Sequence, residues 1–193
     1  MVSNLVRIHH AEYQEDIPFW IEQTEGLNPV IEIGCGYGRV TLPLAEEGRM
    51  MVGVDCDFGS LAYLSSVLKE AGDGIKHQIR LINADILAFH PGFLFGAAII
   101  PCNTYSTFSA VDRLRLLKNV HAYLKEGGLL IISLPNPQRI NAIHTSLGEE
   151  NEQESPDLET VITHPETGFP VQVSSRLRTT RKSILWDWIY DHL

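Results

Sequence analysis

The sequence predicts an α/β fold in which a mostly parallel sheet carries helices on both of its faces. Short apolar segments alternate with amphipathic segments up to residue 135. The last of these apolar segments, residues 129–134, is as continuously hydrophobic as a strand that is covered on both faces. Such alternation implies right-handed crossovers, which place the strands side by side and parallel.

Local signals give the individual elements in order. Residues 5–25 are predicted as one helix that carries Ile17, Trp20 and Ile21 on the same face. Further helices are predicted over residues 39–47, 61–71 and 111–124, where the first ends at Gly48 and the last is stopped by Gly127. Strands are predicted over residues 30–33, 50–54, 79–83, 95–100 and 129–134.

The character of the chain changes after residue 147. Residues 148–160 hold six acidic residues and no basic one, which predicts a solvated loop. Two strands are predicted over residues 171–178 and 184–190, and they form an antiparallel hairpin because the turn between them is too short for a crossover. We therefore expect a main domain over residues 1–147, an acidic loop over residues 148–160 and an antiparallel segment over residues 161–193.

Composition and charge exclude several classes of protein. With 193 residues, of which 44% are hydrophobic, the chain can form one substantial core but is short for two. A net charge of −9 argues against non-specific nucleic-acid binding, which needs a basic face. No apolar run is long enough for a signal peptide or a membrane span, so we expect a cytoplasmic protein.

The most informative motif spans residues 32–39 and reads Glu-Ile-Gly-Cys-Gly-Tyr-Gly-Arg. A strand that turns abruptly into a helix needs glycines, both for its backbone angles and for the close approach of a ligand. A dinucleotide fingerprint that began at Gly34 would place its third glycine at position 39, where this chain has Arg39. No lysine follows to form a phosphate-binding P-loop. The spacing therefore disfavours both of these nucleotide motifs.

Two more acids follow the next predicted strands. Asp55 ends the second strand, 21 residues after Gly34, where a carboxylate can accept hydrogen bonds from both hydroxyls of a ribose. Asp85 follows the third strand. Aspartates at strand ends also cap the next helix, and that alternative stays open for each acid taken alone. The register of both acids with the glycine motif favours a ligand site.

An acid two residues before Gly-x-Gly-x-Gly resembles motif I of the class I S-adenosylmethionine-dependent methyltransferases, and residues 127–131 resemble the start of their fifth strand. The resemblance runs from Tyr13 to Pro137 and implies a Rossmann-like, doubly wound sheet with the strand order 3-2-1-4-5. It also implies S-adenosylmethionine as the cofactor, with Asp55 on the ribose, Asp85 on the adenine amino group and the backbone N–H of Ile86 on the adenine ring. The full set of cofactor contacts implied in this way is Glu32, Gly34, Cys35, Gly36, Gly38, Arg39, Asp55, Cys56, Asp85, Ile86 and Pro101.

The charges at the expected site agree with this cofactor. S-adenosylmethionine carries a sulfonium cation and no phosphate. Glu32, Asp55 and Asp85 lie at the mouths of the first three strands and would form a negative rim that attracts a cation and repels a pyrophosphate.

Three residues are candidates for acting on the methyl acceptor. Asn103 and Tyr105 follow the fourth strand, where acceptor and methyl group meet in the family, although both also suit an ordinary turn. Tyr13 stands where some members have a tyrosine that closes over the methyl site, and an aromatic face can stabilise a sulfonium. The alternative for Tyr13 is a plain helix-surface position.

The three cysteines fall at the ends of three neighbouring strands in the implied order. Cys35, Cys56 and Cys102 have no partner in a Cys-x-x-Cys pair, so we expect no metal site.

The resemblance implies transfer of a methyl group to a nitrogen or oxygen of a small molecule. Methyl transfer mainly needs alignment of the acceptor and exclusion of water, so no catalytic triad is expected. Two alternatives stay open. One is an S-adenosylmethionine-binding protein without turnover, and the other is an NAD-dependent oxidoreductase, which Arg39 disfavours.

The end of the sequence carries aromatic residues at alternate positions. Trp186, Trp188 and Tyr190 share one face of the last predicted strand, and that face must be buried against the acceptor pocket or a second chain. Family members continue with a helix and two more strands beside strand five, whereas this sequence ends at Leu193. We therefore expect either a part of a longer protein, or a homodimer that closes this edge through strand five or the hairpin, with weak or absent turnover.

Overall fold

The computed structural model describes residues 2–11, 13–71 and 73–192, and it divides the chain into two compact units. One unit comprises residues 14–134, and the other joins residues 1–13 to residues 135–193. This division differs from the boundaries expected from sequence, because the N-terminal helix groups with the C-terminal strands and not with the parallel sheet.

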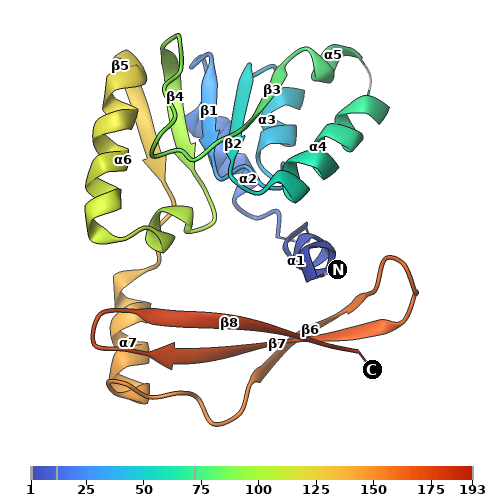
Figure 1. Cartoon of the computed structure of the whole chain (residues 1–193), viewed down its shortest axis with the longest axis vertical. Coiled ribbons are helices and arrows are strands. Elements are labelled where there is room, and N and C mark those ends of the chain that lie inside the picture. Colours follow the sequence, from blue (N-terminus) through green and yellow to red (C-terminus); the bar gives the residue numbers. More distant parts are fainter. Residues whose placement is uncertain (1, 12, 72, 193) are drawn as a thin grey trace. The chain divides into compact units, whose positions relative to one another are not determined.

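The unit of residues 14–134 is a five-stranded parallel sheet with the strand order β3-β2-β1-β4-β5 (Figure 1). Its strands are β1 (Val30–Ile33), β2 (Met51–Asp55), β3 (Ile79–Asn83), β4 (Phe95–Ile100) and β5 (Leu124–Ile132). Its helices are α2 (Ile17–Gln23), α3 (Thr41–Glu46), α4 (Phe58–Glu70), α5 (Asp73–Lys76), the short 3-10 helix η1 (Thr104–Thr107) and α6 (Ala110–Tyr123). The predicted fold class and strand order are confirmed.

Two hydrophobic cores cover the two faces of this sheet. On one face, Ile31 of β1 lies in a core with Leu116 of α6. On the other face, Val30 of β1 lies in a core with Trp20 of α2 and Leu44 of α3. Successive residues of β1 thus point to opposite faces and are all buried, which explains why every position of this strand except Glu32 is apolar.

The prediction of one continuous helix over residues 5–25 is wrong. The structure has two separate helices, α1 (Val2–Ala11) and α2, and residue 12 lies outside the described residues. Pro18 stands in the first turn of α2, where its missing N–H needs no partner. The predicted apolar face is confirmed, because Ile17 and Trp20 are buried and Ile21 packs against the same core.

Two further boundaries differ from the predictions for local reasons. Helix α4 begins three residues early because the Asp57 carboxylate accepts hydrogen bonds from the N–H groups of Gly59 and Ser60. Strand β5 begins at Leu124 and runs through Gly127, with a shift in its register against β4.

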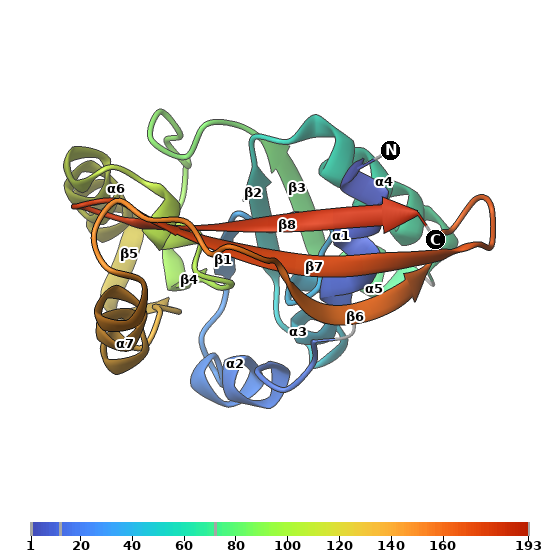
Figure 2. The same cartoon turned by 90° about the horizontal axis from the view of Figure 1, so that it is seen from below.

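The second unit contains α1, α7 (Pro137–Leu147) and a three-stranded antiparallel sheet with the order β6-β7-β8 (Figure 2). Its strands are β6 (Asp157–Thr163), β7 (Pro170–Thr179) and β8 (Ile184–His192). The antiparallel hairpin is confirmed, and β6 adds a strand to it. The loop expected over residues 148–160 is therefore shorter than predicted. Its last residues, from Asp157 onward, belong to β6 and pair with β7. Glu152 forms an ion pair with Arg176 at 2.8 Å and Glu150 one with Arg181 at 3.1 Å, so part of the acidic segment is paired with arginines of the hairpin.

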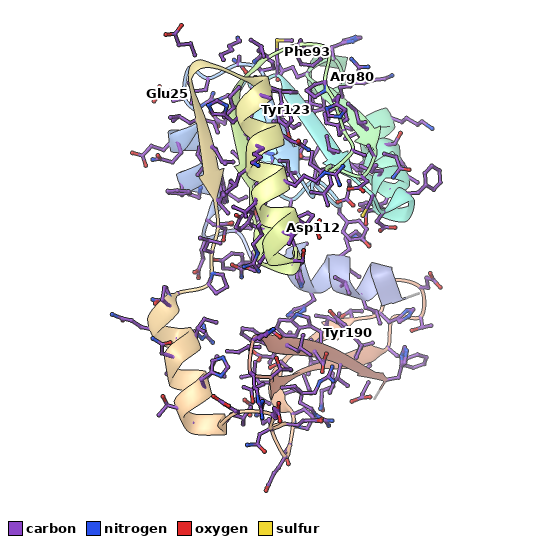
Figure 3. All side chains as sticks on the ribbon, turned by 60° about the vertical axis from the view of Figure 1, so that its left-hand side comes forward. Glu25, Arg80, Phe93, Asp112, Tyr123 and Tyr190 are labelled. Atoms are coloured by element: carbon purple, nitrogen blue, oxygen red, sulfur yellow. The ribbon has the colours of Figure 1, made fainter. Side chains whose placement is uncertain are left out.

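The aromatic face of β8 packs within its own unit. The ring of His9 in α1 meets that of Trp188 edge to face at 4.6 Å, and its Nδ1 lies 3.3 Å from the hydroxyl of Tyr190, which is labelled in Figure 3. Trp186 stacks on Trp188 and is 43% exposed. Helix α1 thus covers part of the face that the sequence analysis assigned to an acceptor pocket or a second chain.

Within the part of the chain that the structure describes, no helix is both long and apolar enough to cross a membrane.

Candidate functional site

The carboxyl ends of four neighbouring strands bring together the loops that the sequence analysis singled out (Figure 1). Residues 34–39 follow β1, residues 56–57 follow β2, residues 84–86 follow β3 and residues 101–103 follow β4. Strand β1 lies between β2 and β4, where the strand order reverses. In open α/β sheets, ligands bind at this point, outside the carboxyl ends of the strands.

Hydrogen bonds hold the glycine turn after β1 in place. The N–H of Gly34 donates to the carbonyl of Val54 at 2.8 Å, and the N–H of Gly38 donates to the carbonyl of Cys35 at 2.9 Å. The N–H of Gly36 donates to the carboxylate of Asp55 at 2.8 Å. Backbone and side-chain groups of β2 therefore fix the shape of the turn.

The three glycines of the turn serve different purposes, although all three have a positive φ. A Cβ on Gly34 would lie 2.7 Å from the methyl group of Thr104, and one on Gly38 would lie 2.5 Å from Leu64. A Cβ on Gly36 would have no neighbour closer than a carboxylate oxygen of Asp55, at 4.0 Å. Gly34 and Gly38 thus permit close packing within the protein, whereas Gly36 faces space that a ligand can occupy.

Asp55 links the glycine turn to the end of β3. Besides the bond from Gly36, its carboxylate accepts one from the N–H of Asp57 at 2.8 Å. Its carbonyl accepts the N–H of Ala84 and the side-chain amide of Asn83, each at 3.0 Å. Because each carboxylate oxygen can accept more than one hydrogen bond, Asp55 keeps capacity for the hydroxyl groups of a ligand beside Gly36.

The loops after β2 and β3 offer both side chains and backbone. Asp85 is exposed, and its Oδ1 accepts the N–H of Leu87 at 2.9 Å, which closes a local turn and does not cap a helix, because the element after β3 is the strand β4. The side chain of Ile86 is buried in the core beneath α6, so a ligand can reach only its backbone. Cys56 is exposed.

Glu32 corrects the prediction of a three-carboxylate rim. It is 2% exposed, and its carboxyl accepts a hydrogen bond from the hydroxyl of Thr41 in α3 at 2.5 Å. Burial raises the pKa of Glu32 to about 8, although the hydrogen bond from Thr41 and the charge of Arg39 act in the opposite direction. The carboxyl is therefore mostly neutral at pH 7. The acids that a ligand can reach at the strand ends are therefore Asp55, the half-buried last residue of β2, and the exposed Asp85.

Arg39 is engaged by protein groups on two sides. Its Nη1 and Nη2 donate to the two carboxylate oxygens of Asp16 at 2.5 and 2.8 Å. The same Nη2 lies 2.9 Å from the Sγ of Cys102. Burial would raise the pKa of Asp16, but the hydrogen bonds from Arg39 and from the indole of Trp20 lower it below its usual value. Arg39 thus joins the start of α2 to the loop after β4.

The loop after β4 has a left-handed backbone at two successive residues that are not glycine. Cys102 has a φ of 55° and Asn103 a φ of 58°, a conformation that costs free energy and clusters at functional sites. Asn103 is exposed. Tyr105 is held from α6, because Arg113 donates to its carbonyl at 3.1 Å and places its guanidinium 5.5 Å from the ring centroid.

Two predicted residues are not among the exposed residues of the parallel-sheet unit. Pro101 is buried at the end of β4. Tyr13 belongs to the other unit, where its side chain is 53% exposed and its N–H donates to the carbonyl of His10 at 3.2 Å. The parallel-sheet unit therefore carries the glycine turn, Asp55, Asp85 and Asn103, and does not include Tyr13.

The cysteines are free thiols in three different surroundings. Cys35 is buried where its sulfur would lie 2.8 Å from a Cβ on Gly53, and burial raises its pKa. Cys102 contacts Arg39, and Cys56 is exposed. Among the described residues, no three His, Cys, Asp or Glu side chains are grouped as metal ligands.

Sequence reasoning missed four residues of this site, namely Asp16, Thr41, Asn83 and Thr104. Asn83 had a usable signal, because it is a polar residue at the end of a strand two positions before Asp85. The position of Asp16 before α2 indicates a helix cap, but its side chain makes no capping hydrogen bond. Thr41 and Thr104 act through contacts with residues distant in sequence, which no local pattern reveals.

Comparison with known proteins identifies the family of this chain. The model of a family described as "Methyltransferase domain" matches residues 30–128, slightly more than half of the chain. The chain belongs to this methyltransferase family. The matched region begins with β1 and ends in β5, so it contains all four loops of the site. The resemblance inferred from the glycine motif is confirmed.

Individual relatives of this methyltransferase domain are distant. A protein of Geobacillus sp. (strain WCH70) named "Putative methyltransferase" is 24% identical over 132 residues, which are 65% of this chain and 52% of that protein. The chain thus spans about half the length of this curated relative. Among solved structures, the glycopeptide N-methyltransferase MtfA complexed with sinefungin has a TM-score of 0.64 at 20% identity, and the alignment covers 93% of this chain and 69% of that one. The CcbJ methyltransferase from Streptomyces caelestis has a TM-score of 0.64 at 16% identity, with coverage of 92% and 76%. These likenesses show a shared fold.

Proposed function

We propose that this methyltransferase domain binds S-adenosylmethionine and transfers its methyl group to a nitrogen or oxygen of a small molecule. The observation that carries the proposal is the open space in front of Gly36, directly beside the carboxylate of Asp55. A ribose can lie against Gly36, where no side chain obstructs it, and donate its hydroxyl hydrogens to Asp55. Solved complexes of MtfA with sinefungin, S-adenosyl-L-homocysteine and S-adenosyl-L-methionine support this choice of ligand.

Different residues of the site are proposed to bind different portions of S-adenosylmethionine, according to which strand they follow. Asp85 and the backbone of Ile86 are proposed to bind the adenine. The glycine turn is proposed to bind the methionine portion through its backbone, and the buried Glu32, which accepts a hydrogen bond from Thr41, is proposed to act on this portion only through the turn. Cys56 and Pro101 are proposed to border the ligand on either side of β1.

When bound, S-adenosylmethionine supplies an electrophilic methyl group on a sulfonium centre. The task of the chain itself is to align the acceptor and exclude water. The exposed amide of Asn103 can both donate to and accept from an acceptor, and Tyr105 is the other proposed contact of this unit. The names of two proteins with a similar fold support a nitrogen acceptor. One is a glycopeptide N-methyltransferase, and the other is CalS10, an amino pentose methyltransferase.

Calorimetric titration tests the class of ligand. We expect S-adenosylmethionine or S-adenosylhomocysteine to bind with micromolar affinity, about −8 kcal/mol, and NAD not to bind. Binding of NAD without binding of S-adenosylmethionine would replace this proposal with a nicotinamide-dependent oxidoreductase. An assay of labelled methyl transfer to small amines and alcohols then distinguishes an enzyme from a protein that binds the cofactor without turnover.

Asp55→Ala should weaken cofactor binding by about 1.5–3 kcal/mol, or roughly 10- to 150-fold, because it removes a charged acceptor of two hydroxyls. Since Asp55 also holds Gly36, a thermal melt must accompany the titration. Asp112→Ala, at the start of α6, serves as a control in which a carboxylate is lost elsewhere on the same unit. Unchanged affinity in Asp55→Ala would place the ribose elsewhere.

We also propose a homodimer contact along β5. This strand lies at the edge of the sheet and is apolar over residues 129–132, and Leu129 is 45% exposed. An unpaired apolar edge favours pairing with another strand. Sedimentation at increasing concentrations should show a dimer that Leu129→Lys dissociates. A wild-type protein that stays monomeric throughout would contradict the proposal.

A further inference from the structure

We infer that Asp16 and Arg39 are positioning residues that hold the Cys102–Asn103 turn in the form that borders the cofactor site. The inference rests on the proposed function for the identity of the ligand, but the contacts that carry it belong to the chain alone.

The first step is that Asp16 precedes a helix but binds an arginine and does not cap that helix. An aspartate directly before a helix normally accepts hydrogen bonds from the first N–H groups of that helix. Asp16 makes no such bond, because its carboxylate accepts both Nη groups of Arg39 and the indole N–H of Trp20. The side chains of Asp16 and Arg39 are only 21% and 12% exposed. A bidentate, partly buried pair of this kind holds its geometry far better than a single contact at the surface.

The second step is the reach of Arg39 toward the loop after β4. Its Nη2 contacts both Asp16 and the sulfur of Cys102, so the carboxylate fixes the guanidinium that touches this loop. Cys102 is itself the first of the two left-handed residues. Such backbone persists only where the surroundings hold it, and Arg39 supplies a contact at that point.

The third step is the connection to the glycine turn. Arg39 directly follows Gly38, and Thr104 directly follows the left-handed pair and fills the space at Gly34. The turns after β1 and β4 are therefore joined by two contacts, from Arg39 and from Thr104. Loss of Asp16 should loosen one of these contacts and leave the other in place.

Hydrogen–deuterium exchange on the ligand-free protein tests the structural part of this inference. In Asp16→Asn, amides of residues 101–108 should exchange roughly fivefold faster or more, because the turn opens more often. Arg49→Met is the matched control, since Arg49 ties the other end of α2 through the carbonyls of Ile21 and Thr24. It should leave residues 101–108 unchanged. Equal exchange of these amides in wild type and Asp16→Asn, or equal acceleration in both variants, would overturn the inference.

A double-mutant cycle on S-adenosylhomocysteine affinity tests the connection to the ligand. Asp16→Asn and Cys102→Ala should each weaken binding by roughly three- to tenfold, and the double variant should be no weaker than Asp16→Asn alone. Asp16→Glu, which keeps the charge, should restore part of the affinity. Multiplicative effects would show that the two residues act independently, and would overturn the positioning role. If wild type binds no S-adenosylhomocysteine, the proposed function fails, whereas the exchange experiment still decides the positioning of the turn.

Discussion

The Gly36→Val variant should fold and yet bind neither S-adenosylmethionine nor S-adenosylhomocysteine. An added Cβ has an Asp55 carboxylate oxygen, at 4.0 Å, as its nearest contact outside the turn itself, so the chain has room for the first added atom. The φ of 50° at this position costs a side chain about 1–2 kcal/mol, which a domain of this size tolerates. The side chain then occupies the space proposed for the ligand. Calorimetry measures the loss of binding, and a thermal melt verifies the fold.

Gly38→Ala is the matched control within the same turn. Its Cβ would lie 2.5 Å from Leu64, a buried residue of α4, so the variant should lose stability through a clash in the core. The smaller variant Gly36→Ala decides the question if Gly36→Val does not fold. Near-normal affinity in a folded Gly36 variant would remove the glycine turn from the site.

Glu32→Gln should make the stability of the protein less dependent on pH. In the folded state, burial raises the pKa of Glu32 to about 8, whereas the unfolded chain ionises near its ordinary value of 4.5. Between these values, unfolding releases a proton, so the contribution of Glu32 is fully present below pH 4.5 and is lost as the pH rises through 8. The slope approaches about 1.4 kcal/mol per pH unit within this window. Glutamine can still accept the hydrogen bond from Thr41 but does not titrate.

Urea unfolding at pH 5.5 and pH 8.5 measures this difference. The wild type should lose about 2–4 kcal/mol more than Glu32→Gln between the two values. Thr41→Val tests the same titration independently. It removes the hydrogen bond that Thr41 donates to the ionised carboxyl, so the pKa of Glu32 should rise further. The same pH dependence in wild type and Glu32→Gln would show that Glu32 titrates normally in the folded protein.

The local sequence was sufficient for the architecture of the parallel sheet. The predicted ranges 79–83 and 95–100 agree with β3 and β4. Strand β4 is buried and free of polar side chains at every position, as expected for a strand covered on both faces. Strand β3 lies at the edge of the sheet and is only partly buried, but its β-branched and apolar residues still mark it as a strand. The glycine motif and Asp55 also predicted which strand ends carry the proposed ligand site, since close approach to a backbone and acceptance from a ribose impose residue types at fixed distances from a strand end.

The tertiary structure alone decided which of the predicted residues are available to a ligand. Sequence spacing placed Glu32 and Arg39 in the same motif as Gly36, but the fold buries Glu32 beneath Thr41 and pairs Arg39 with Asp16. The partners in these contacts lie nine and 23 residues away. Likewise, α1 groups with strands near the other end of the chain, more than 140 residues further on. A local pattern states which face of an element is apolar, but the partner of a charge or a face depends on which distant segment the fold brings beside it.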